Sequence, residues 1–292
     1  KHNVDLCDRE ARMAAAMGVL RAVDPYVRIA SDAERAAETN RAGVVEAKRW
    51  SGDMGYIRVE GLDAGSGEKI GSRLTQWSTN GVGGVILDVR GASGSDLDSV
   101  RRIAGLFVRS GTPLYALADF HGRQERTFTS ERSPLFDAQP LLLLADSDTR
   151  GAAEALVAVL AGRTGVLILG GRTGGDPMAR QWVRLSERWA ALIGTRKILP
   201  STNRDYADGV EPDVAIGAVA ALAEGLDGEH AEGGAAPGDG ERVEERIERD
   251  VVLRRAMDIL RGLKAIDEYW GRHLAVRPEA STNFPTTGST TR

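Results

Sequence analysis

The chain contains little cysteine, no long apolar run and no excess of basic residues. Among its 292 residues, Cys7 is the one cysteine, which excludes an internal disulfide and leaves only an intermolecular one. No stretch reaches the roughly 18–20 apolar residues that span a bilayer. The net charge of −4, with both signs interspersed, gives no basic surface for nucleic acid. We therefore expect neither a transmembrane segment nor a nucleic-acid partner.

Lysine is also scarce, and none occurs between Lys69 and Lys197. The four histidines are scattered, and none is paired with a cysteine or carboxylate at the spacing of metal ligands. They are His2, His121, His230 and His273. Gly170–Asp176 is a glycine-rich loop, but it lacks the Gly-Lys-Ser/Thr ending of a phosphate-binding loop. The sequence thus predicts no metal and no cofactor.

From Asp53 onward the chain alternates strand-like and helix-like segments. Gly84–Val89 is an apolar run typical of a buried parallel strand. Asp96–Val108 repeats its apolar residues with a helical period. Such alternation implies right-handed βαβ crossovers and an α/β fold in which helices flank a mostly parallel sheet. Further strands are expected at Met54–Val59, Pro113–Ala118, Leu141–Ala145 and Val166–Leu169, helices at Glu68–Ser78 and Ala152–Leu160, and a hairpin at Gln181–Leu185 and Trp189–Ile198.

Composition divides the chain into five regions. Ser31 with Glu34 three residues later forms a capping box, which indicates a helix start in the N-terminal part. Residues 224–241 are rich in glycine, alanine and acidic residues, as linkers are, and the chain end is rich in threonine, serine and proline. The predicted regions are an N-terminal helical region (1–52), the α/β core (53–222), a flexible linker (223–241), a C-terminal helical segment (242–274) and an extended or disordered tail (275–292).

Seven segments, in the right order, resemble the S41 family of C-terminal processing (tail-specific) peptidases. Residues 19–29 resemble the family's LDPYS region, and Gly84–Gly94 resembles its LDLRNNPGG strand and loop. The other matches are Gly55–Val59, Arg150–Leu160 (the helix of the serine), Leu169–Pro177 (the loop of the lysine), Gly209–Val214 and Val252–Gly262. The resemblance implies a crotonase/ClpP-like core of βαβ units with a C-terminal β-hairpin and flanking N- and C-terminal helices.

The two catalytic positions of that family depart from its pattern. The serine position is Gly151, three residues before Glu154, and glycine has no side chain to form an acyl-enzyme. The lysine position, 25 residues later, is Asp176, and a carboxylate is a poor substitute for a neutral amine. Arg180 stands where the family often has glutamine, and a guanidinium stays protonated. We therefore expect the serine–lysine pair to be lost.

Two further family features are reduced. Only Arg41–Gly52 fills the place of the PDZ module, which is too short for an independent domain, so capture of substrate tails through that module is expected to be lost. In the oxyanion hole, Gly94 matches the first glycine of the family's loop and Ser95 replaces the second. Together with Ala152, these residues predict a cleft that keeps a backbone donor for a peptide or carboxylate.

Three functions follow as alternatives. The first is a non-catalytic scaffold or accessory subunit, whose partners are other protein subunits, a membrane-associated complex or further copies of the chain. The second is a peptide- or small-ligand-binding module that uses the old cleft. The third is a residual hydrolase that uses Ser147, or the pair of Asp176 and Glu154. Against Ser147 stands the interpretation of Asp146–Thr149 as turn and cap residues. The resemblance also implies a periplasmic or otherwise extracytoplasmic location.

Overall fold

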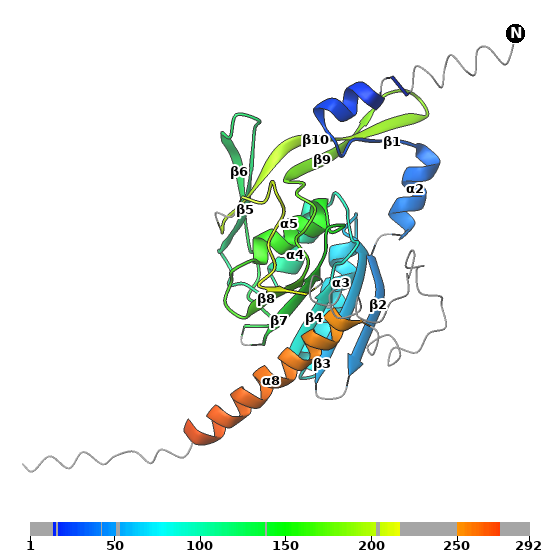
Figure 1. The fold of residues 1–292 in the computed structure, drawn as a ribbon. Helices are drawn as coiled ribbons and strands as arrows, with labels where there is room; N and C mark the ends of the chain where they lie inside the picture. Colours follow the sequence, from blue (N-terminus) through cyan, green and yellow to red (C-terminus); the bar gives the residue numbers. More distant parts are fainter. Residues whose placement is uncertain are drawn as a thin grey trace, which may run out of the picture.

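Two β-sheets and the helices around them make up the described part of the chain (Figure 1). The structure is a computed structural model. It describes residues 14–15, 17–41, 43–50, 53–137, 139–202, 205–216 and 250–274. The predicted linker at 223–241 and the tail at 275–292 lie outside these residues. Among the described helices, none has the length and apolar character needed to cross a membrane.

The larger sheet has six strands in the order β11-β8-β7-β4-β3-β2. Its strands are β2 (Gly43–Trp50), β3 (Met54–Gly61), β4 (Gly84–Asp88), β7 (Leu141–Ala145), β8 (Val166–Gly170) and β11 (Val214–Ala215). All neighbouring strands are parallel except β2 and β3. Every residue of β4 and β7 is buried, because both faces of the sheet are covered. The predicted mostly parallel sheet is confirmed.

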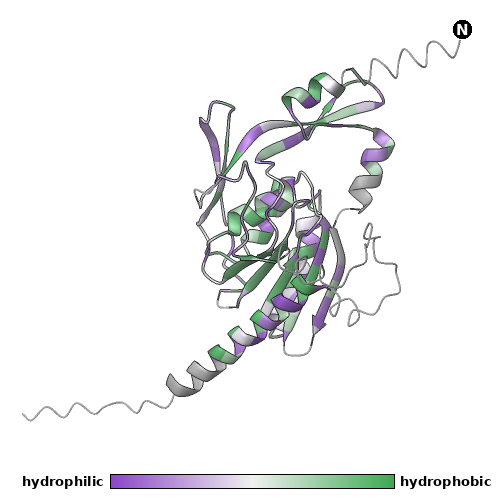
Figure 2. Ribbon diagram, viewed as in Figure 1, coloured by the Kyte–Doolittle hydropathy of each residue, from purple (hydrophilic) through white to green (hydrophobic). Residues whose placement is uncertain are grey.

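Helices cover this sheet on both faces. On one face lie α3 (Ser66–Thr79), α4 (Leu97–Ala104) and α5 (Gly151–Leu160), and on the other lies α8 (Val251–Leu274). Along β4, Val85 and Leu87 pack toward the first group, while Ile86 packs toward α8, because side chains alternate along a strand. Figure 2 shows apolar residues concentrated in the central strands and in α5. All ten residues of α5 are buried, so its N-terminus is firmly placed.

The smaller sheet is antiparallel and centres on the long strand β10. Its members are β1 (Arg28–Ser31), β5 (Pro113–Ala118), β6 (Gln124–Thr129), β9 (Met178–Arg184) and β10 (Trp189–Pro200). The order is β1-β10-β5-β6, and β9 also pairs with β10. The predicted hairpin of β9 and β10 is confirmed. β6 was not predicted from the sequence, because its side chains are nearly all exposed and show no apolar alternation.

The N-terminal region was predicted to be helical, but the structure shows strands there as well. Its described part is helical up to residue 23 and in α2 (Asp32–Arg41), but it also contains the strands β1 and β2. Both strands form by pairing with distant partners, β10 and β3, which short local patterns do not encode. The capping box is confirmed: the Ser31 amide donates to the Glu34 carboxylate at 2.7 Å, and the Glu34 amide donates to the Ser31 hydroxyl at 3.3 Å.

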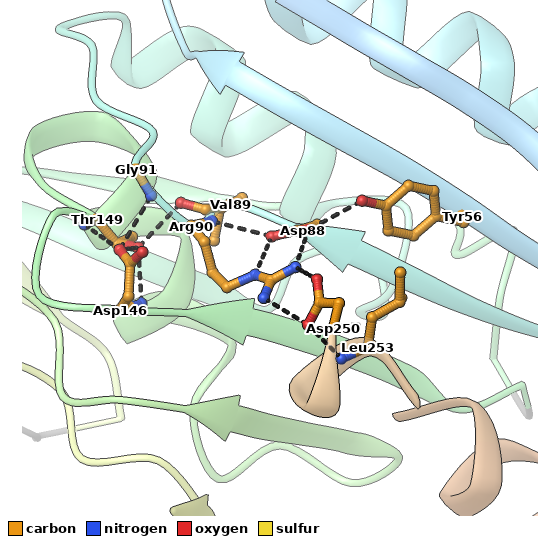
Figure 3. Close-up of polar contacts among 9 residues, drawn as sticks. All are labelled: Tyr56, Asp88, Val89, Arg90, Gly91, Asp146, Thr149, Asp250 and Leu253. Carbon is orange, nitrogen blue, oxygen red and sulfur yellow. Dashed lines mark hydrogen bonds and ion pairs between the residues drawn. The ribbon is translucent and has the colours of Figure 1, made fainter. Parts of the chain in front are cut away.

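A charged clamp fastens α8 to the larger sheet (Figure 3). The Arg90 guanidinium donates to Asp88 at 2.8 Å and to Asp250 at 2.6 Å. Asp250 also accepts the Leu253 amide at 3.0 Å in the first turn of α8, and Tyr56 donates to Asp88 at 2.9 Å. Burial disfavours the charged guanidinium, but the two carboxylates outweigh burial and raise the pKa of Arg90 above its ordinary value. The clamp therefore favours the charged form of Arg90 and fixes the start of α8.

Candidate functional site

A cleft of about 620 Å³ opens where the N-terminal segment, the loops after β3, β4 and β7, and the hairpin meet. This is the carboxyl edge of the parallel strands, the usual ligand side of an α/β sheet. The cleft brings together four of the site residues predicted from the sequence, namely Gly94, Ser95, Gly151 and Asp176. Within the described residues its cations are four arginines, Arg21, Arg28, Arg150 and Arg180, and no lysine lines it.

Gly151 begins α5 in a conformation that disfavours any side chain. Its φ is 57°, in the left-handed region that glycine tolerates and other residues rarely adopt. A Cβ atom at this position would lie 2.4 Å from the carbonyl oxygen of Gly94. A serine therefore cannot occupy position 151 unless the Gly94 loop or the start of α5 moves.

The same carbonyl engages the backbone donor expected at Ala152. The Ala152 amide donates to the Gly94 oxygen at 2.9 Å. Position 94 itself requires glycine, because its φ is 135° and a Cβ there would lie 2.3 Å from the Leu62 oxygen. An oxyanion hole needs donors that point at the position of the developing charge. In this structure the Ala152 donor instead closes a contact within the chain.

Asp176, at the lysine position, belongs to a buried network of charges. Its carboxylate accepts from Arg180 Nε at 2.6 Å and from Arg180 Nη2 at 2.9 Å. The other side of the guanidinium donates to both oxygens of Asp24, at 2.8 and 2.9 Å. The side chains of Arg180 and Asp176 are only 5% and 4% exposed. Two-pronged contacts of this kind combine charge with fixed geometry.

Electrostatics favour the charged forms of Arg180 and Asp24. Burial disfavours the charged guanidinium, but hydrogen bonds to Asp176 and Asp24 raise the pKa of Arg180 above its ordinary value. Burial also opposes ionisation of Asp24, yet the Arg180 and Gly194 donors hold the pKa of Asp24 below its ordinary value. The Tyr26 ring lies 5.4 Å from the Arg180 guanidinium. The network thereby links the N-terminal segment, through Asp24, to the loop that contains Asp176.

Glu154 anchors the same loop from below. Its buried carboxylate accepts the amides of Gly175 and Asp176, each at 2.7 Å, and the hydroxyl of Thr173. Burial raises the pKa of Glu154, although these donors favour the ionised form. Glu154 therefore contacts the backbone of Asp176, while the Asp176 side chain contacts Arg180. The structure thus places Glu154 and Asp176 next to each other through the Asp176 amide, while each of the two carboxylates accepts hydrogen bonds from donors in the surrounding structure.

Ser147 lies on the exposed turn that precedes α5 and is not among the residues that line the cleft. Asp146 accepts the Thr149 amide at 3.0 Å, as expected of a turn (Figure 3). The cap interpretation needs correction, because the residue before α5 is Arg150 and its side chain makes no capping bond. The Thr149 hydroxyl instead donates to the Val89 carbonyl at 2.9 Å, which connects the ends of β7 and β4.

Asp24, which pairs with Arg180, was not among the site residues predicted from the sequence. A signal for it was present, because positions 176 and 180 both depart from the family pattern and carry opposite charges. That change indicates an ion pair. The second carboxylate comes from a segment more than 150 residues away, and only the fold brings it there.

The network yields a test by unfolding. Arg180→Gln leaves Asp176 buried without its cation, so we expect the free energy of unfolding in urea to fall by about 3–5 kcal/mol. Asp176→Asn in the same background removes the unpaired charge and should recover part of the loss. Arg261→Gln is the control, because Arg261 pairs with Asp258 on the exposed side of α8 and should change little. Equal effects of both arginine substitutions would contradict the network's importance.

The close approach at α5 yields a second test. Gly151→Ser should lower the free energy of unfolding by about 1–3 kcal/mol or more, because the backbone conformation is unfavourable and Gly94 is too close. Gly71→Ser is the matched control: Gly71 lies within α3, and a Cβ there meets no atom within 4 Å. Serine is the better helix former, so this control should not destabilise the protein. Similar stability of the two variants would refute the constraint.

The sequence matches the profile of a known protein family and the sequences of several of its members. The profile of Peptidase family S41 matches residues 53–216. The chloroplastic C-terminal processing peptidase of Tetradesmus obliquus and the protease CtpB of Bacillus subtilis are each 26% identical over 164 residues, which is 56% of this chain. The match covers 35% and 34% of those proteins, so the chain spans about a third of their length.

Solved structures show a likeness of fold. A putative S41 protease from Bacteroides fragilis has a TM-score of 0.55 at 20% identity, covering 75% of this chain and 57% of that one. The photosystem II D1 C-terminal processing protease has a TM-score of 0.50 at 23% identity, covering 65% and 48%. The resemblance seen in the sequence motifs is thus confirmed, and the mixed α/β fold matches S41 structures. Since the family profile covers more than half of the chain, the protein belongs to peptidase family S41.

Proposed function

We propose that this S41 family member is a non-catalytic protein that acts as a scaffold or accessory subunit of a larger assembly. The start of α5 carries the proposal. There Gly151 takes the place of the nucleophile, with the Gly94 oxygen 2.4 Å from where a Cβ would lie. Covalent peptidase chemistry of this type needs a hydroxyl or thiol at that point.

The position of the general base supports the same conclusion. A lysine that acts as a base must lose its proton, so it requires surroundings that favour the neutral amine. Asp176 and Arg180 form the opposite arrangement, an ion pair whose geometry stabilises both charged forms. The Arg180 guanidinium does not deprotonate in proteins, so it is no substitute for the lysine.

A scaffold role follows from what the chain retains. The strands of the larger sheet and α5 keep a fully packed core, so the fold is maintained without the catalytic pair. Arg41–Gly52, the place of the family's PDZ module, holds the edge strand β2. We further propose a crotonase/ClpP-like core and a periplasmic or otherwise extracytoplasmic location. The proposed partners are other protein subunits, in a membrane-associated complex or as copies of this chain.

Binding of a peptide in the cleft is a second candidate function. The cleft of about 620 Å³ falls within the range of ligand sites. Arg21 lines it and makes no ion pair with any residue in the described part of the chain. A guanidinium with no ion-pair partner among the described residues, in a cleft also lined by apolar side chains such as Val27 and Leu192, suits the carboxylate end of a peptide.

An activity assay tests the loss of catalysis. We expect no labelling by a fluorophosphonate and no cleavage of tail peptides, for the wild type and for Ser147→Ala alike. An active S41 peptidase serves as the positive control for both reagents. Labelling or cleavage that disappears in Ser147→Ala would establish the residual hydrolase and overturn the proposal.

Native purification separates the scaffold from the binding module. We expect the wild type to be recovered in a complex with other subunits or copies, whereas a lone monomer that binds no peptide contradicts both roles. Peptides with a free C-terminal carboxylate that raise the melting temperature of the wild type, but not of Arg21→Ala, would favour the binding module. Amidated peptides of the same sequence are the matched control.

A further inference from the structure

A second cavity of about 670 Å³ lies on the smaller sheet, away from the cleft. It forms over β5, β6 and β10, beside the segment after β10, and shares no lining residue with the cleft. The loop of the old lysine separates the two, since Asp176 lines the cleft and Pro177 lines the second cavity. This cavity has no part in the chemistry of S41 peptidases discussed above.

The floor of the second cavity is formed by three neighbouring side chains of the smaller sheet. In the register of the sheet, Ala116 of β5 pairs with Leu199 of β10 on one side and with Thr127 of β6 on the other. Directly paired residues share a face of the sheet, so these three side chains form one surface. Because Ala116 lies between two larger neighbours, the middle of this surface is hollow.

The charge around the cavity is biased toward cations. Lys197 lines it and makes no ion pair with any residue in the described ranges. Arg163 lies beside it and donates to the Pro113 carbonyl at 2.9 Å and the Ser201 hydroxyl at 3.0 Å, both part of the lining. These acceptors are neutral, and burial lowers the pKa of Arg163. The one carboxylate among the lining residues is Asp205.

We propose that this cavity binds a small amphipathic anion, with its apolar body on Ala116 and Leu199 and its anionic head at Lys197. The volume lies within the roughly 300–1,000 Å³ of small-molecule sites. A mostly apolar lining with a few placed polar groups is also typical of such sites. Lys197 supplies a point charge that a carboxylate pairs with, and Arg163 adds positive potential behind the rim. The proposal does not depend on whether the cleft is catalytic.

Isothermal titration with octanoate tests the site. We expect saturable binding to the wild type and about tenfold weaker binding to Lys197→Met, because a charge-assisted contact is lost while the volume is kept. Lys69→Met is the matched control, since Lys69 lies on α3 and does not line this cavity, so this variant should bind as the wild type does. Octanol, which has the same body without the charge, should bind the wild type more weakly than octanoate.

The position of the bound octanoate is tested separately. Amide chemical shifts at Ala116 and Thr127 should change on titration, and Ala116→Leu should weaken binding of octanoate because it fills the hollow floor. No saturable binding to the wild type would overturn the proposal, as would equal affinity for Lys197→Met. Shift changes confined to Gly94 and Ser95 would also overturn it, because the ligand would then occupy the cleft.

Discussion

The ion network around Arg180 holds the site together. Burial of a guanidinium costs free energy unless its charge is matched. Here the Arg180 guanidinium donates to two carboxylates, those of Asp176 and Asp24. Asp176 comes from the old lysine loop and Asp24 from the N-terminal segment, so the network joins parts of the chain that are distant in sequence. Removal of Arg180 would leave both carboxylates without their cation, and that of Asp176 is buried. The departures from the family pattern at positions 176 and 180 are therefore coupled, and both involve Asp24, which lies in the segment that resembles the family's LDPYS region.

The contact between α5 and the Gly94 loop involves position 151, which aligns with the family's serine. α5 is buried along its whole length, so its first turn cannot shift without disturbing the core. With no side chain at 151, the Gly94 carbonyl approaches and accepts the Ala152 amide. The two positions that align with the family's serine and lysine thus both make structural contacts, a pattern consistent with the proposed loss of peptidase activity.

Much of the fold was predictable because its signals are local. The runs in β4 and β7 are apolar throughout, and the periodicity of α3 and α8 is plain in the sequence. By contrast, β1 and β6 form through pairing with distant strands and carry no pattern of their own. At the site, the resemblance to the S41 family identified Gly151 and Asp176. The direction of the Gly94 carbonyl was not predictable, since residue types do not encode the orientation of a peptide plane.

A catalytic lysine and a structural ion network make opposite demands on the same loop. Catalysis requires an amine that is poorly paired and easily deprotonated, which costs stability. Here Glu154 holds the loop backbone, and Arg180 holds the Asp176 side chain, so both are paired. The two cavities lie on either side of this loop. A loop paired in this way is consistent with the proposed non-catalytic role, whereas a peptidase needs its base free to exchange protons.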